Sequence, residues 1–145
     1  MMQKALKFQT DGKGLYLITD KIRQNLDYKG SALLNIFLRH TSCSLIIQEN
    51  ADPTAKADLE EFFNRLAPEH QDWHRHTLEG PDDTTSHLKS ALTQSSLNIP
   101  VVDGKLGLGS WQGIYLFEHR DMPHEREILL SLVPLVSALE QTDFL

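Results

Sequence analysis

Cysteine is almost absent from this sequence, since Cys43 is the only cysteine among the 145 residues. A single cysteine excludes an intrachain disulfide bond and a metal site built from cysteines alone. Cys43 begins an apolar run, so we expect its side chain to face the core. The alternative is a nucleophilic thiol, which an adjacent histidine would activate by lowering its pKa.

Positive charge and long apolar runs are also scarce. The sequence has 14 Lys and Arg against 20 Asp and Glu, a formal net charge of −6 at pH 7. This balance argues against binding to nucleic acid or to an anionic membrane. The apolar runs fall far short of the roughly 20 residues that a membrane-spanning helix needs, and the N-terminus lacks the apolar stretch of a secretory signal. We therefore expect a soluble cytoplasmic protein with no nucleic-acid or membrane partner.

The length suits one domain, and neither a repeat nor a flexible linker divides the chain, so we expect a single domain over residues 1–145. Apolar patterns predict an N-terminal β-hairpin that turns at residues 11–14. They predict further strands at residues 32–38, 43–48, 97–102, 114–118 and 128–136. The runs at 32–38 and 43–48 are apolar almost throughout, which indicates strands covered on both faces, or strands whose second face meets a partner subunit.

The clearest helix signal follows residue 51. Asp52 is a favoured N-cap and Pro53 suits the first helical position. An apolar stripe then recurs at helical spacing: Ala55, Leu59, Phe62 and Leu66. A second helix is predicted from about Asp83, with Leu88, Ala91 and Leu92 on its apolar face, and a short one is predicted to begin with a cap at Thr19 or Asp20.

The order of these elements favours the α+β class, with a mixed or antiparallel sheet packed against two main helices. A sheet this rich in apolar strands, with only two substantial helices to cover it, leaves a face for a partner. We therefore expect a homo-oligomer.

Two polar stretches flank the apolar run at 43–48. The first holds His40, Ser42 and Ser44, and its residues would also suit a tight turn between strands. The second holds Glu49 and Asn50 at a strand end, where functional sites are commonly built.

A third polar stretch runs from His76 to His87. If a helix begins near Asp83, then Asp83 and His87 lie four residues apart on one face, and the loop after His76 can fold back toward them. Such a group suits a metal site with a carboxylate beside an imidazole, or an acid/base couple. Alternatively, Asp83 interacts only with the helix N-terminus and His87 lies on the surface.

A glycine-rich segment runs from residue 104 to 113 and includes Gly109, Ser110, Trp111 and Gln112. It is neither a dinucleotide fingerprint nor a Walker loop, because a strand rather than a helix follows it. Its free backbone N–H groups could bind an anion, with charge from Arg120 or Arg126, or the segment is a turn that packs Trp111. A surface salt bridge is the ordinary role of those two arginines.

Three segments together resemble one known family. HTSCSLIIQENADP, EGPDDTTSHLKSAL and IPVVDGKLGLGSWQGIYLFEHRD are similar to the YjbQ-like family, also called secondary thiamine-phosphate synthases, from about Gly14 to Ile128. The usual Gly-Thr-Trp-Gln has Ser110 in place of Thr, and Pro123-His124-Glu125 replaces the usual Gly-Gly before Arg126.

The resemblance implies a small α+β domain that forms a homotrimer, with polar pockets near the subunit boundaries. It implies a divalent metal, zinc or magnesium, and a weak transferase activity that joins a pyrimidine diphosphate to a thiazole phosphate and releases pyrophosphate. The expected metal ligands are His40, His76 and His87, and the expected catalytic residues are His40, Glu49, Asp83 and His87. The expected contacts to a phosphorylated metabolite are Ser42, Ser44, Asn50, Gly109, Ser110, Trp111, Gln112 and Arg126.

Two other functions suit the same residues. One is a trimeric protein that binds a metal or an anion without turnover, and the absence of a strong catalytic motif favours it. The other is a metal-dependent hydrolase of a small metabolite.

Overall fold

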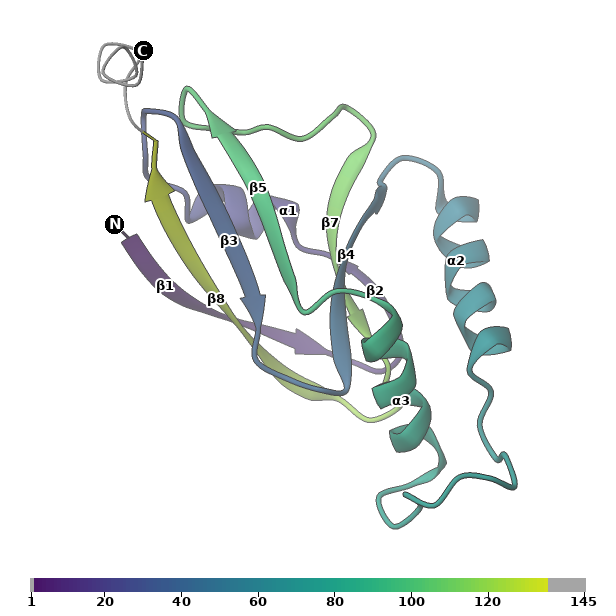
Figure 1. Ribbon diagram of the computed structural model, residues 1–145. Helices are drawn as coiled ribbons and strands as arrows, with labels where there is room; N and C mark the ends of the chain where they lie inside the picture. The colour runs from purple at the N-terminus through teal and green to yellow at the C-terminus, as the bar shows by residue number, and fades with distance from the viewer. Residues whose placement is uncertain (1, 136–145) are drawn as a thin grey trace, which may run out of the picture.

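Two antiparallel sheets face each other in the computed structural model, which describes residues 2–135 (Figure 1). The elements follow in the order β1 (Met2–Thr10), β2 (Gly14–Leu17), α1 (Thr19–Gln24), β3 (Ala32–Leu38), β4 (Cys43–Glu49), α2 (Pro53–Leu66), α3 (Pro81–Leu92), β5 (Ser96–Val102), β6 (Lys105–Leu106), β7 (Gln112–Glu118) and β8 (His124–Pro134). The predicted α+β class is confirmed. Residue 136, the predicted end of the last strand, lies outside the described residues.

The larger sheet has the strand order β1-β8-β3-β5-β6, and the smaller has the order β2-β7-β4. The predicted N-terminal hairpin is wrong, because β1 pairs with β8 and β2 pairs with β7. Gly12, in the turn after β1, and Gly14, the first residue of β2, adopt φ angles of 127° and 146°, which only glycine adopts readily. These glycines turn the chain from one sheet to the other.

The main core lies between the two sheets. Alternate residues of β3, including Leu34 and Ile36, pack there with Leu45 of β4 and Leu116 of β7. The prediction that the 32–38 strand is covered on both faces is wrong for the single chain, because Leu33 and Phe37 on its other face remain 36% and 44% exposed. Within residues 2–135, no helix is both long enough and apolar enough to cross a bilayer.

Helix α2 covers the outer face of the smaller sheet. Its predicted start is confirmed, because Asp52 Oδ1 accepts a hydrogen bond from Thr54 N at 2.9 Å and Pro53 is the first helical residue. Phe63 is the buried residue, and its ring lies edge-on to that of Phe117 with centroids 5.3 Å apart. Leu59 of the predicted stripe packs against the same cluster, whereas Phe62 and Leu66 stay 55% and 51% exposed.

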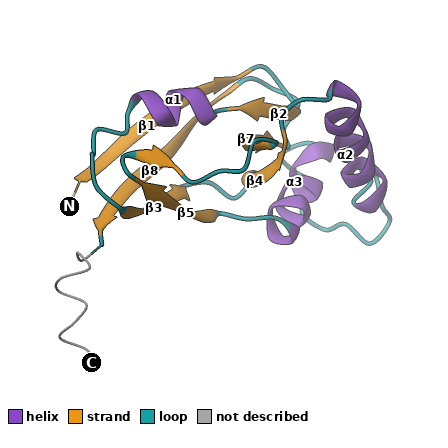
Figure 2. Cartoon of the chain, turned by 90° about the horizontal axis from the view of Figure 1, so that it is seen from above, coloured by secondary structure: helices purple, strands orange, loops and turns teal. Residues whose placement is uncertain are grey.

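Helix α3 lies beside β4, on the same side of the molecule as α2 (Figure 2). It begins at Pro81 and buries a polar face: Asp82, Asp83, Thr85, Ser86 and Lys89. The predicted apolar face points outward instead, and Leu92 is 59% exposed. The short helix α1 has no side-chain cap, because Thr19 Oγ1 accepts from Ile114 N rather than capping the helix.

Candidate metal centre

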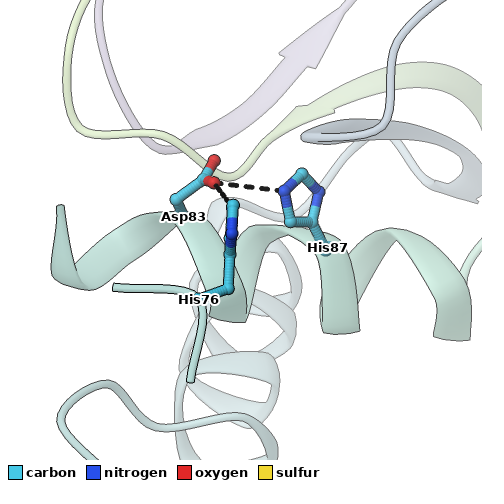
Figure 3. A group of neighbouring side chains, drawn as sticks. All are labelled: His76, Asp83 and His87. Carbon is cyan, nitrogen blue, oxygen red and sulfur yellow. Dashed lines mark hydrogen bonds and ion pairs between the residues drawn. The ribbon is translucent and has the colours of Figure 1, made fainter. Parts of the chain in front are cut away.

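His76, Asp83 and His87 meet at the N-terminal end of α3 (Figure 3). Asp83 and His87 lie one helical turn apart, and the loop before α3 folds back to bring His76 alongside. One nitrogen of each imidazole and one oxygen of Asp83 lie within 4.8 Å of one another. Asp83 Oδ2 is 2.5 Å from His76 Nε2 and 3.2 Å from His87 Nε2.

The loop is held in this position by bonds to α3. Thr84 Oγ1 donates a hydrogen bond to the carbonyl oxygen of His76. Gly80 precedes the helix with a φ of 104°, a conformation that other residues rarely adopt. Pro81 then supplies a preset first helical position. The Gly80-Pro81 pair thus reverses the chain close to the Asp83 carboxylate.

Arg120, which follows β7, orients the carboxylates of α3. Its guanidinium donates to Asp82 Oδ2 at 3.0 Å, to Asp83 Oδ1, and to the carbonyl oxygen of Glu79 at 2.9 Å. The Arg120 side chain is only 16% exposed, so the expected surface salt bridge is wrong for this residue. Since Oδ1 of Asp83 is occupied by Arg120, Oδ2 is left to face the two histidines.

The bond from His87 to the β3–β4 turn places a hydrogen on one nitrogen of its ring. His87 Nδ1 lies 2.8 Å from the carbonyl oxygen of Thr41, which can only accept, so Nδ1 carries a hydrogen. In the neutral ring, Nε2 then presents a lone pair to the Asp83 carboxylate. A cation between them, either a proton or a metal ion, relieves that repulsion.

The Asp83 carboxylate stays ionised although it is buried. Burial alone would raise its pKa, but hydrogen bonds and the charges of His87 and Arg120 outweigh this effect and hold the pKa below its ordinary value. The Asp83 side chain is 2% exposed, whereas those of His76 and His87 are 51% and 39% exposed. The cluster of His76, Asp83 and His87 therefore has a buried, anionic side at Asp83 and a side open to solvent at the two histidines.

Hollows adjoin both histidines. One of 220 Å³ is lined by His76 together with His70, His74 and Thr84. Another of 520 Å³ is lined by His87 with His40, Thr41 and Ser90. Of the three residues of the group, only His87 lines the larger hollow.

His40 lines that hollow but does not join the three ligand atoms. Its Nε2 accepts a hydrogen bond from Glu127 N at 2.8 Å, so this nitrogen has no free lone pair for a metal. Burial, together with the charge of Arg126, lowers the pKa of His40. The structure therefore places His40 beside the group rather than in it.

The glycine-rich segment and the end of β4 lie together elsewhere. Asn50 Nδ2 donates to the carbonyl oxygen of Gln112 at 3.3 Å, and Gly109 N donates to Gln112 Oε1 at 2.8 Å. Glu49 and Gln112 pair at one end of the β4–β7 ladder, whereas α3 begins near the other end. A strand of this length spans roughly 20 Å. One chain therefore does not bring Glu49, Asn50 or the segment with Ser110 and Trp111 to the histidine group.

Arg126 is enclosed within the protein. Its Nε and Nη2 donate to the two oxygens of Glu118 at 2.7 and 2.6 Å, and Nη2 also reaches the carbonyl oxygen of Ser42. Burial alone would raise the pKa of Glu118, but its bonds to Arg126 and Thr10 lower it. The guanidinium expected to bind phosphate is thus committed to an internal ion pair.

Ser44 and Cys43 also point inward. Ser44 Oγ lies 2.9 Å from Nε2 of His119, a buried histidine that the sequence motifs did not single out as functional. Cys43 is 1% exposed, which confirms that it faces the core. Burial raises the pKa of its thiol to about 12, so Cys43 does not have the properties of an activated nucleophile.

Comparison with known proteins identifies the relatives of this chain. The profile of the family described as UPF0047 protein YjbQ-like matches residues 4–134. A UPF0047 protein of Synechocystis is 48% identical over 130 residues, which cover 88% of each chain. The UPF0047 protein YjbQ of Escherichia coli is 41% identical over 133 residues, covering 90% of this chain and 96% of the relative.

Solved structures share the fold. The crystal structure of a conserved hypothetical protein from Thermus thermophilus matches with a TM-score of 0.82 and 38% identity, over 90% of this chain and 99% of that one. A hypothetical protein from Aeropyrum pernix matches with a TM-score of 0.84 and 28% identity, over 93% and 100% of the two chains. The resemblance inferred from the three motifs is confirmed, and the chain belongs to the UPF0047 YjbQ-like family.

Proposed function

We propose that this protein binds one divalent metal ion through His76, Asp83 and His87. The convergence of their three ligand atoms within 4.8 Å carries the proposal. Two imidazoles and one carboxylate suit zinc better than magnesium, which prefers oxygen ligands and retains several waters. A protein site of three ligands with an open side is typical of catalytic metals rather than structural ones.

Neighbouring groups support this donor set. The hydrogen bond from His87 Nδ1 to Thr41 leaves Nε2 as the ligand nitrogen. Arg120 binds Asp83 Oδ1, the oxygen that does not contact the histidines. Glu79 lies 3.5 Å from His76 Nε2 and would supply a further carboxylate at the rim. When bound, the ion would supply Lewis-acid charge to an anionic group of the substrate.

We propose a small phosphorylated metabolite as the substrate, held in the 520 Å³ hollow beside His87. The thiamine-phosphate synthase reaction is the first candidate, because its pyrophosphate leaving group needs neutralising charge. In that reaction, Asp83 and His87 would position the cation and His40 would contact the substrate from the wall of the hollow. A metal-dependent hydrolase, or a protein that binds the metabolite without turnover, is the alternative.

We also propose the homotrimer. Two sets of apolar side chains are exposed in the single chain, and a partner would cover them. They are Leu33 and Phe37 on the larger sheet, and Leu66, Trp73 and Leu92 near α2 and α3. Glu49 and the Gly109–Gln112 segment lie far from the histidine group, so their expected roles require packing of identical chains. Light scattering tests this: three times 16.5 kDa is expected, and a stable monomer at micromolar concentration contradicts it.

The activity is tested by supplying both thiamine precursors to the purified protein with zinc or magnesium. Turnover by the unchanged protein and its loss in His87→Ala are expected. Equal turnover in both proteins removes His87 from the mechanism. If neither protein turns over, release of phosphate from the single precursors is measured next; its absence favours the binding protein.

A further inference from the structure

A third hollow, lined by polar residues, lies between the start of β2, helices α2 and α3, and the end of β7. It measures 130 Å³ and is lined by Lys13, Gly14, Glu60, Asn64, Lys89, Phe117 and Glu118. It shares no lining residue with the hollows around His76 and His87. Lys13 and Asn64 are accessible to solvent, so the cavity lies next to the surface.

Lys89 lines this cavity, and its ammonium group has no anionic partner among the described residues. The residue is 3% exposed, and its Nζ donates one hydrogen bond, to Asn64 Oδ1 at 2.7 Å. Across residues 2–135, no carboxylate oxygen lies within 4.0 Å of that nitrogen. An ammonium group has three donors, so two remain for a bound molecule. Burial and the charge of Lys13 lower the pKa of Lys89, and an anion bound beside the ammonium group would offset both effects.

Glu60 brings the complementary charge. Its Oε1 accepts from Leu15 N at 2.9 Å, while Oε2 has no hydrogen-bond partner in the described part of the chain. Nor does any basic side chain described here lie within 4.0 Å of the carboxylate. Lys89 and Glu60 are therefore too far apart to pair with each other, although they line the same cavity.

The other two charged residues of the lining are already paired. Lys13 forms ion pairs with Glu69 and, at 3.4 Å, with Asp121. Glu118 is bound by the buried Arg126. Two charged groups of the lining therefore remain unpaired, the cation of Lys89 and the anion of Glu60. A ligand that carries one charge of each sign would pair with both.

We propose that this cavity binds a small zwitterion of amino-acid size, with its carboxylate on Lys89 and its ammonium group on Glu60. A cavity of about 150 Å³ in another protein holds a ligand of six carbon atoms, so 130 Å³ suits a molecule of comparable size. A doubly charged anion such as phosphate fits less well, because it would face the carboxylate of Glu60. The proposal does not depend on the metal centre or on the proposed reaction.

The test measures binding of glycine, L-alanine and β-alanine to metal-free protein by saturation-transfer NMR. Acetate and methylammonium, each with one of the two charges, are the matched half-ligands. Lys89→Met and Glu60→Gln remove one partner each, and Lys105→Met, at an exposed lysine on β6, is the control. Lys89→Met is expected to fold, since a buried charge can be replaced by an apolar group of similar shape.

At least one zwitterion is expected to bind, with each half-ligand and each cavity variant weaker by about tenfold or more, and the control unchanged. Three results overturn the proposal: no zwitterion binds, acetate binds as well as the zwitterion, or both cavity variants retain full affinity. If Lys89→Met does not fold, Glu60→Gln alone decides. Loss of zinc binding in His87→Ala has no bearing on this result.

Discussion

His87 is joined to Thr41 by a hydrogen bond from its Nδ1 to the Thr41 carbonyl oxygen, at 2.8 Å and across 46 positions of the chain. The bond ties α3 to the turn between β3 and β4 and directs Nε2 toward Asp83. Because the acceptor is a backbone atom, the orientation does not depend on the side chain at position 41. The histidine is thus positioned as a ligand by the fold itself.

Arg120 should determine metal affinity without being a ligand. Replacing it with leucine removes the partner of Asp83 Oδ1 and leaves that carboxylate free to turn. We expect zinc affinity to fall about 10- to 100-fold, the usual cost of losing an outer-shell partner. Competition with a chromophoric chelator measures this. Arg39→Leu, at an exposed ion pair, is the control, and equal affinities in the two variants would show that Arg120 has no positioning role.

The pair of Arg126 and Glu118 should be structural. Arg126→Met leaves a carboxylate buried without its counter-charge, and we expect the free energy of unfolding to fall by about 3–5 kcal/mol. The exposed pair of Arg39 and Glu127 should contribute less than about 1 kcal/mol when broken by Arg39→Met. Urea unfolding compares the two variants. If the Arg126→Met protein is as stable as the unchanged protein and loses only phosphate binding, then Arg126 binds phosphate, as the sequence predicted.

His119 should make the protein sensitive to mild acid. Burial, together with the charge of Lys89, lowers its pKa to about 3, against about 6.5 in the unfolded chain. Between these values the unfolded state binds more protons, so stability falls as the pH drops below about 6.5. At about pH 5 the loss should be about 2 kcal/mol relative to neutral pH.

His119→Gln keeps a polar partner for Ser44 but does not titrate. Its urea midpoint should therefore change less between neutral pH and about pH 5 than that of the unchanged protein. Parallel pH dependence in the two proteins would show that His119 is not held neutral.

Cys43 should be unreactive in the folded protein. Its thiol is 1% exposed and has a pKa of about 12, so almost no thiolate is present at neutral pH. Ellman's reagent should label it only after denaturation. Rapid labelling of the native chain would reopen the nucleophile hypothesis.

The metal group could be anticipated because its members are close in sequence. The spacing of Asp83 and His87 places them on one helical face, and a short loop brings back His76. Arg120 could not be assigned in this way, because its carboxylate partners lie 37 and 38 residues away and only the sheet topology brings them near.

Helix α3 shows where the pattern of apolar residues misleads. Leu88 and Leu92 predict an apolar face that packs on the sheet, yet the helix buries Asp82 and Lys89 instead. Arg120 binds Asp82 and Asp83 from far along the chain, and the hydroxyls of Thr85 and Ser86 donate to carbonyl oxygens of α3 itself, so a pattern of apolar residues does not reveal this burial. The predicted pairing of β1 with β2 is wrong for a similar reason, because β1 pairs with β8 at the far end of the chain and local patterns do not reveal that contact.

Zinc stoichiometry decides whether His76, Asp83 and His87 form a metal centre. The chain is stripped with a chelator, dialysed against zinc and analysed for bound metal, alongside His76→Ala, Asp83→Asn, His87→Ala and the control His124→Ala. We predict one zinc ion per chain in the unchanged protein and the control, and loss of the ion in the other three variants. An unchanged protein that retains no zinc, or a His87→Ala variant that retains a full equivalent, would show that these three residues do not form a zinc site.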